Sequence, residues 1–297
     1  MKYHSHGKLL IAGEYLVLKG ATALAVPVNF GQTLSIEKNE LSGNLSWVSY
    51  ENGKPWFSAE FSNGLLDVVK TSDEKIASNL VAVLKYSIEL NPEFQDQLYG
   101  KQVISNADFN LAWGLGSSSS LVSNIAYWAN VNPFVLHKGV SQGSGFDVVT
   151  ARAGGPVFFK KKRTGYELTP ADFNPEFKNN IFFIYLGNKQ DSSESVNKFR
   201  LRKRSLKTEQ NLISQLSQHI ALSKQIEDFE YYIKEHELII SAVLKMKSIK
   251  ETRFDDLNGE IKSLGAWGGD FAMMTWHGSR DELINYLQTK NHHCFLI

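Results

Sequence analysis

A loop of glycines and serines separates a predicted strand at 102–110 from a predicted helix at 120–130 and reads Trp113-Gly114-Leu115-Gly116-Ser117-Ser118-Ser119-Ser120. At such a junction, glycines let the backbone approach an anion closely, and the first N–H groups of the helix point towards it. Serine hydroxyls add donors or a magnesium ligand. No Gly-Lys-Ser or Gly-Lys-Thr follows at the required spacing, so a Walker A loop is excluded. A flexible turn that caps the helix is the alternative that this loop alone leaves open.

The hydrophobic pattern on both sides of this loop predicts an α+β fold. Glu51-Asn52-Gly53-Lys54 is typical of a hairpin turn, and Ser72-Asp73-Glu74 is typical of a helix start. From Ile226 to Val243, apolar residues recur every three or four positions, so they share one face of a helix. Strands are expected at 8–18, 22–36, 102–110, 181–186, 271–276 and 294–297. Helices are expected at 72–90, 120–130, 253–264 and 281–288, and in two long stretches after the strand at 181–186.

The chain of 297 residues is long enough for two domains. A polar, proline-containing segment near 165–178 marks the boundary, which gives domains at 1–168 and 169–297. Lys and Arg number 32 and Asp and Glu 31, so the net charge of +1 predicts neither nucleic acid nor a membrane as partner. The single cysteine, Cys294, cannot form an internal disulfide, and no apolar run has signal-peptide or membrane-spanning length. We therefore expect a cytoplasmic monomer or homodimer.

Four blocks together resemble the GHMP kinase superfamily, which includes mevalonate and phosphomevalonate kinases. The Gly-Leu-Gly-Ser-Ser sequence at 114–118 resembles that superfamily's ATP-phosphate loop. Gly7 to Tyr15, with Gly20 and Ala23-Leu24 after it, is similar to the first motif, and Gly265 to Asp270 is similar to the third. Gly143-Ser144-Gly145-Phe146-Asp147 resembles the segment that carries the catalytic aspartate, in a wording closer to phosphomevalonate kinases. Because the blocks occur in the expected order along nearly the whole chain, the chain is identified as a member.

This resemblance implies a fold and an activity. The fold would have an N-terminal domain like ribosomal protein S5 and a C-terminal ferredoxin-like α+β domain. The activity would be transfer of the ATP γ-phosphoryl group, with Mg²⁺, to a small metabolite such as mevalonate or phosphomevalonate, on the mevalonate route to isoprenoids. Two alternatives are an enzyme of the diphosphomevalonate decarboxylase type and a non-catalytic nucleotide- or metabolite-binding relative.

Two residues are expected to carry the chemistry. Asp147 would accept the proton of the acceptor hydroxyl and orient it for in-line attack. Lys8 would place a positive charge near the transferring phosphoryl group. The alternative roles are an Asp147 that only caps a helix beginning at Val148 and a Lys8 that is a solvated surface lysine.

Other residues are expected to bind the ligands. By resemblance, Gly114, Leu115, Gly116, Ser117, Ser118 and Ser119 surround the ATP phosphates, and Ser118 also holds magnesium. The expected acceptor-binding residues are Glu14, Tyr15, Ser192, Ser193, Gly265, Gly268 and Gly269. Glu14 and Tyr15 could instead end a strand with a structural hydrogen bond, and Ser192 or Ser193 could simply cap a helix.

The sequence departs from the family pattern in several places: His6 stands where relatives usually carry proline, only 29 positions separate Ser118 from Asp147, and two further differences affect the expected site. Relatives of the mevalonate type carry a magnesium-binding glutamate about eleven residues before the aspartate, whereas this chain has Val135-Leu136-His137-Lys138 there. Magnesium would then depend on Ser118, the nucleotide and water, which the ion tolerates, or catalysis would be weak or absent. Trp267 replaces a glycine of the third motif and adds bulk to a loop expected to be tight. His236, on the apolar helix face, is expected to be a hydrogen-bonded core histidine rather than a metal ligand.

Overall fold

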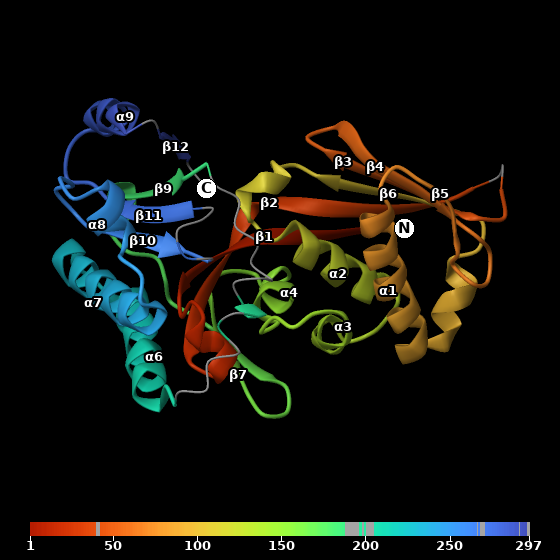
Figure 1. Ribbon diagram of the computed structural model, residues 1–297, viewed down its shortest axis with the longest axis horizontal. Coiled ribbons are helices and arrows are strands. Elements are labelled where there is room, and N and C mark those ends of the chain that lie inside the picture. Colours follow the sequence, from red (N-terminus) through yellow and green to blue (C-terminus); the bar gives the residue numbers. More distant parts are fainter. Residues whose placement is uncertain are drawn as a thin grey trace. The chain divides into compact units, whose positions relative to one another are not determined.

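The computed structural model describes residues 1–39, 42–187, 196, 197, 199, 205–265, 267, 271–290 and 292–295 (Figure 1). The chain divides into two compact units that alternate along the sequence. The first unit comprises Met1–Lys8, Val28–Leu111 and Leu115–Arg152, and the second comprises Leu9–Pro27, Ala112–Gly114 and Ala153–Ile297. The predicted domain boundary between residues 168 and 169 stays a prediction.

The larger sheet has eight strands in the order β5-β4-β3-β6-β2-β7-β8, with β1 paired to β2. Within the first unit, Gln32–Lys38 of β2 pairs with β6, and within the second unit Thr22–Ala25 of β2 pairs with β7. Both long strands, β1 and β2, therefore contribute residues to each unit. The strands are β1 (Lys2–Ala12), β2 (Thr22–Lys38), β3 (Leu45–Glu51), β4 (Lys54–Phe61), β5 (Val68–Thr71), β6 (Lys101–Ala107), β7 (Val157–Lys161) and β8 (Tyr166–Pro170).

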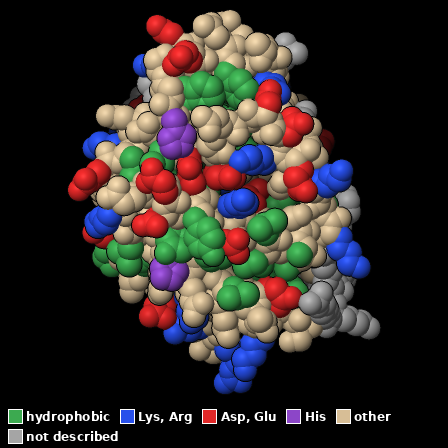
Figure 2. All heavy atoms as spheres, turned by 90° about the vertical axis from the view of Figure 1, so that its left-hand side faces the viewer, with side chains coloured by type: hydrophobic (Ala, Val, Ile, Leu, Met, Phe, Trp, Pro, Cys, Tyr) green, Lys and Arg blue, Asp and Glu red, His purple; other side chains and the backbone are tan. Residues whose placement is uncertain are grey.

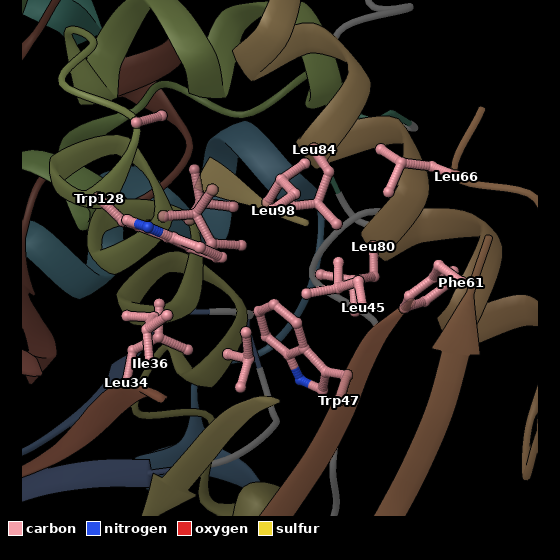
Figure 3. Packing of buried hydrophobic residues seen from close by; sticks show 14 of the residues in the cluster. Leu34, Ile36, Leu45, Trp47, Phe61, Leu66, Leu80, Leu84, Leu98 and Trp128 are labelled. Atoms are coloured by element: carbon pink, nitrogen blue, oxygen red, sulfur yellow. The ribbon is translucent and has the colours of Figure 1, made fainter. Parts of the chain in front are cut away.

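The helices of the first unit pack on this sheet around an apolar core. In Figure 3, Trp47 and Phe61 from the sheet lie near Leu80 and Leu84, with Trp128 beyond them. The predicted hairpin is confirmed, because Asn52 and Gly53, with φ of 48° and 75°, form the two-residue turn between β3 and β4. The helices are α1 (Glu74–Leu90), α2 (Ser117–Trp128), α3 (Pro133–Val140) and α4 (Phe146–Thr150). Asp73 caps α1, as its sequence predicted.

The second unit contains an antiparallel four-stranded sheet in the order β10-β11-β9-β12. Its strands are β9 (Ile181–Tyr185), β10 (Ile261–Leu264), β11 (Phe271–Thr275) and β12 (His293–Phe295). Its helices are α6 (Lys207–Leu222), α7 (Ile226–Leu244), α8 (Ile249–Arg253) and α9 (Arg280–Thr289). Among the described residues, none of the helices combines the length and the apolar character needed to cross a membrane.

The helix predicted at 253–264 is wrong. A capping box at Ser248 starts α8 earlier, and the helix ends at Arg253. Gly259 then adopts φ of 142°, and a Cβ there would lie 2.6 Å from the carbonyl oxygen of Thr275. This close approach brings the following residues beside β11, so Ile261–Leu264 pair as a strand.

The predicted apolar face of α7 is confirmed. Phe229, Ile233, His236 and Ile240 are buried, whereas Tyr231 and Leu238 on the other side are exposed. On the face of the molecule shown in Figure 2, hydrophobic side chains form several groups separated by acidic and basic ones. The mixture of strands and helices in both units agrees with the predicted α+β class.

The core of the first unit gives a test of this packing. Trp47 is 1% exposed and Trp56, on the neighbouring strand, is 41% exposed. We expect Trp47→Ala to lower the free energy of unfolding by about 3–5 kcal/mol, because it opens a cavity beneath α1. The matched variant Trp56→Ala should lower the free energy of unfolding by less than about 1 kcal/mol. Urea unfolding of both variants measures the difference, and equal losses would contradict the described core.

Candidate active site

The predicted phosphate loop leads directly into α2. Gly116 is the N-cap residue of this helix, with φ of 90°, and no side chain caps the first turn. A helix start without a side-chain cap leaves backbone N–H groups for an anion. Gly114, with φ of 69°, belongs to the second unit, while Leu115 to Ser119 belong to the first. Within the first unit, the described geometry is therefore compatible with the predicted anion site.

Lys8, predicted to be catalytic, lies against this loop. Its backbone N–H donates to the carbonyl of Leu115 at 2.8 Å. A Cβ on Gly116 would lie 3.0 Å from Cε of Lys8 and would press on the lysine side chain, and the φ of 90° also favours glycine. The Lys8 Nζ lies 5.6 Å from the centroid of the Phe146 ring, a cation–π distance. The lysine ammonium is thus beside the residue that precedes Asp147.

Asp147 is the second residue of α4, and its carboxylate is held at both oxygens. Oδ2 accepts a hydrogen bond from the Ser119 hydroxyl at 2.5 Å, and Oδ1 accepts from the N–H of Val148 at 3.1 Å. The side chain remains partly exposed. The N-cap of α4 is Gly145, so the alternative that Asp147 caps a helix beginning at Val148 is wrong. Gly145 is required here, because with φ of 84° a Cβ would meet the Phe134 ring at 2.7 Å.

The described oxygen donors around the α2 start suit magnesium. The Ser118 side chain is exposed, whereas Ser119 and Ser120 are buried. Magnesium prefers oxygen ligands and keeps several waters, so an exposed serine hydroxyl is a side chain that the ion accepts. In the described part of the chain, no group of three or more His, Cys, Asp or Glu side chains could hold a metal. The predicted role of Ser118 in metal binding therefore stays a prediction.

The second unit brings Glu14, Tyr15 and Gly265 together. Glu14 is 1% exposed, and its Oε1 lies 2.5 Å from Nζ of Lys262, which is fully buried. Burial raises the pKa of the Glu14 carboxyl, while Lys262 and the N–H of Gly265 oppose that rise. The hydroxyl of Tyr15 accepts a hydrogen bond from the N–H of Trp267 at 3.0 Å. The structure thus connects the first motif, which contains Glu14 and Tyr15, to the third, which begins at Gly265. These contacts agree with the alternative that Glu14 and Tyr15 make structural hydrogen bonds. Their contact with an acceptor stays a prediction.

Trp267 has a definite place in this arrangement. Its indole N–H donates to the carbonyl of Lys247 at 3.2 Å, and its ring packs in an apolar cluster with Leu16, Ile240 and Leu244. The large Trp267 side chain, whose role the sequence left unexplained, therefore packs on the C-terminal part of α7 and bonds to Lys247, just after the helix. Tyr15 itself has φ of 58° and ψ of −47°, a conformation rare outside glycine. Such strain persists only where contacts fix it, as they do here.

Two residues of α7 complete this buried cluster. His236 is buried, and its Nε2 accepts a hydrogen bond from the N–H of Gly13 at 3.0 Å, so the prediction of a core histidine is confirmed. Burial and the nearby Lys262 lower the pKa of His236 well below its usual value. Sequence reasoning missed Glu237 and Lys262. Oε1 of Glu237 lies 3.8 Å from Nζ of Lys262, and burial raises the pKa of Glu237 to about 8.

Four predicted acceptor residues, Ser192, Ser193, Gly268 and Gly269, lie outside the described residues. Gly265 is described, with φ of 73°, and no atom of the described residues lies within 4 Å of a Cβ built on it. Its backbone conformation explains the glycine, and its predicted contact with substrate stays a prediction.

Comparison with known proteins places this geometry in a known fold. The sequence matches no protein-family model and no curated protein. Among solved structures, phosphomevalonate kinase from Streptococcus pneumoniae, in complex with phosphomevalonate and AMPPNP, matches with a TM-score of 0.74 and 16% identity, over 100% of this chain and 98% of that one. Mevalonate kinase from Methanococcus jannaschii matches with a TM-score of 0.68 and 17% identity, over 99% and 96%. The chain has the GHMP kinase fold.

Galactokinase from Lactococcus lactis, complexed with galactose, is similar to the chain in the same way. The match has a TM-score of 0.67 and 13% identity, and it covers 97% of this chain and 88% of that one. The predicted two-domain GHMP architecture of class α+β is therefore confirmed. At these identities the likeness establishes the GHMP fold and leaves the substrate to other arguments.

The raised pKa of Glu237 predicts a pH dependence of stability. The folded protein keeps the Glu237 proton up to a pKa of about 8, while the unfolded chain releases it near the ordinary value of 4.5. The unfolded state therefore binds fewer protons between these values, and stability falls as pH rises. Relative to Glu237→Gln, the free energy of unfolding of the wild type should fall by up to about 1.4 kcal/mol per pH unit between about pH 5 and 8. Above about pH 8 the difference between the two proteins should no longer change.

Urea unfolding at several pH values, with Glu235→Gln on the same helix as control, measures this difference. Taking the difference between the two proteins isolates the titration of Glu237 together with its electrostatic coupling to Lys262 and Glu14. Parallel curves for the wild type and Glu237→Gln would show that Glu237 is already ionised in the folded protein at pH 7.

Proposed function

We propose that the chain is an ATP-dependent kinase of the GHMP type that phosphorylates a small metabolite, with mevalonate and phosphomevalonate as the first acceptors to test. The observation that carries this proposal is the convergence, within the first unit, of Lys8 and Asp147 at the start of α2. A lysine ammonium, a carboxylate held at both oxygens and backbone N–H groups at a helix start are the groups that phosphoryl transfer requires. The solved phosphomevalonate kinase with AMPPNP supports ATP as the donor.

Each residue has a distinct task in this proposal. The N–H groups of the loop from Gly114 to Ser119 bind the phosphates of ATP. Asp147 accepts the proton of the acceptor hydroxyl. The hydroxyl oxygen forms a bond to the γ-phosphorus of ATP, while the bond between that phosphorus and the oxygen bridging to the β-phosphate breaks. Lys8 offsets the negative charge on the transferring group. Magnesium, held by Ser118 together with the nucleotide and water, would neutralise further phosphate charge when bound.

The remaining predictions concern the acceptor and the context. Ser192, Ser193, Gly265, Gly268 and Gly269 are proposed to contact the acceptor, alongside Tyr15. We also propose a cytoplasmic monomer or homodimer without nucleic acid or membrane partners, which size-exclusion chromatography with light scattering can begin to test.

The second candidate function is decarboxylation coupled to phosphorylation, as in the diphosphomevalonate decarboxylase type. ADP release with magnesium and ATP should be measured across mevalonate, phosphomevalonate, diphosphomevalonate, homoserine and sugar acceptors, with carbon dioxide followed in parallel. ADP release without carbon dioxide supports the kinase, and release of both with diphosphomevalonate supports the decarboxylase. ATP binding without turnover of any acceptor would leave the non-catalytic relative.

Asp147→Asn tests the proposed base. The amide keeps the size of the side chain but cannot take the proton, so kcat should fall on the order of 10²–10⁴-fold while ATP binding is retained. Asp96→Asn, at an exposed position of the same unit, is the matched control and should leave kcat unchanged. Near-normal turnover of Asp147→Asn would remove this carboxylate from the mechanism.

Ser118→Ala tests the metal ligand. Without the hydroxyl, half-maximal activity should require more magnesium and kcat should fall, with little loss of stability because the side chain is exposed. Steady-state rates against magnesium concentration provide the measurement. An unchanged magnesium curve would show that Ser118 does not bind the ion.

A further inference from the structure

Four consecutive serines at the start of α2 face different surroundings. Successive residues of an α-helix are rotated by about 100°, so identical side chains in a row point in different directions. Ser118 is exposed, while Ser119 is 8% exposed and Ser120 fully buried. The Ser120 hydroxyl donates to Oε1 of Gln32, on strand β2, at 2.8 Å. The Ser119 hydroxyl donates to Oδ2 of Asp147.

The contact between Ser119 and Asp147 joins two segments that are 28 residues apart in the chain. Ser119 was expected to bind the ATP phosphates, yet its hydroxyl proton is already directed at the carboxylate. The other oxygen of Asp147 is bonded to the N–H of its own neighbour, Val148, which moves with it. Of these two hydrogen bonds, the one from Ser119 is therefore the one that fixes the carboxylate relative to the phosphate loop.

Ser119 is itself held in place by the sheet. Ser120, the next residue, bonds to Gln32 of β2, and Nε2 of Gln32 donates to Oγ of Ser105 on β6 at 2.7 Å. All three side chains are buried in the first unit. A chain of buried hydrogen bonds thus sets the rotation of the first turn of α2 about its axis, and with it the direction of the Ser119 hydroxyl.

We propose that Ser119 is a positioning residue for Asp147 and that its hydroxyl does not bind the nucleotide. Its hydroxyl donates to Oδ2 and holds the carboxylate plane in one orientation, with further lone pairs directed at the acceptor hydroxyl. Ser119 keeps its own proton throughout, and the proton from the acceptor goes to Asp147. This proposal rests on the proposed kinase function for its effect on rate, while the orientation of Asp147 can be observed without turnover.

Ser119→Ala removes the hydroxyl and keeps a good helix former, so the fold is retained. With the proposed acceptor, we expect kcat to fall roughly 10- to 100-fold, because a misdirected base reacts less often. The KM for ATP and the magnesium requirement should stay unchanged, in contrast to Ser118→Ala. Ser123→Ala is the matched control: its hydroxyl is buried on the same helix and has no hydrogen-bond partner among the described residues. That control should leave all three quantities unchanged.

A crystal structure of Ser119→Ala gives the second readout. The Asp147 side chain should leave its wild-type rotamer or occupy more than one. An unchanged kcat, a raised KM for ATP, or an Asp147 carboxylate in its wild-type place would each overturn the proposal. If the wild type phosphorylates no acceptor, the kinase function fails, and the position of Asp147 in the variant crystal still decides whether Ser119 holds it.

Discussion

In the second unit, the side chains of a glutamate and a lysine are buried together. Glu14 and Lys262 are 1% and 0% exposed, and the lysine ammonium also donates to the carbonyl of Ser263. Removing each charge from water costs several kcal/mol, which only a close partner and additional hydrogen bonds offset. The position of the Gly13–Tyr15 turn, the register of β10 and the face that α7 presents are therefore mutually dependent. Glu237 is a second acidic side chain beside Lys262, and burial raises its pKa to about 8.

Local physics made part of the fold predictable. The Asn52-Gly53 turn, the Asp73 cap and the apolar face of α7 each depend on residues within one or two turns of chain, so the sequence was sufficient. The helix expected at 253–264 failed because Ser248 competes as a helix start and Gly259 packs against Thr275, a contact that no local pattern shows. Lys262 sits in the short segment Ile-Lys-Ser-Leu, and nothing nearby in the sequence marks it as buried.

The candidate site shows the same division. The loop from Gly114 to Ser119 could be predicted as a phosphate site because its glycines and serines are contiguous, and Lys8 and Asp147 could be predicted as catalytic because each lies in a motif of its own. The sequence could not assign a role to each serine, because the four residues are identical in type. That assignment comes from the rotation of α2, which Gln32 and Ser105 fix from the sheet. The role of Trp267 was equally hidden, because its partners at Tyr15 and Lys247 are distant in the chain.

The separation of Glu14 from its partner has a consequence for the order of events on the ribosome. The two residues are 248 positions apart, so most of the chain is synthesised before Lys262 emerges. Until then, burying the Gly13–Tyr15 turn would leave the Glu14 side chain without the partner that it has in the folded protein. The residues of the first unit, which end at Arg152, are all available much earlier. Contacts within the first unit can therefore form before Lys262 is synthesised, whereas the burial of Glu14 depends on Lys262.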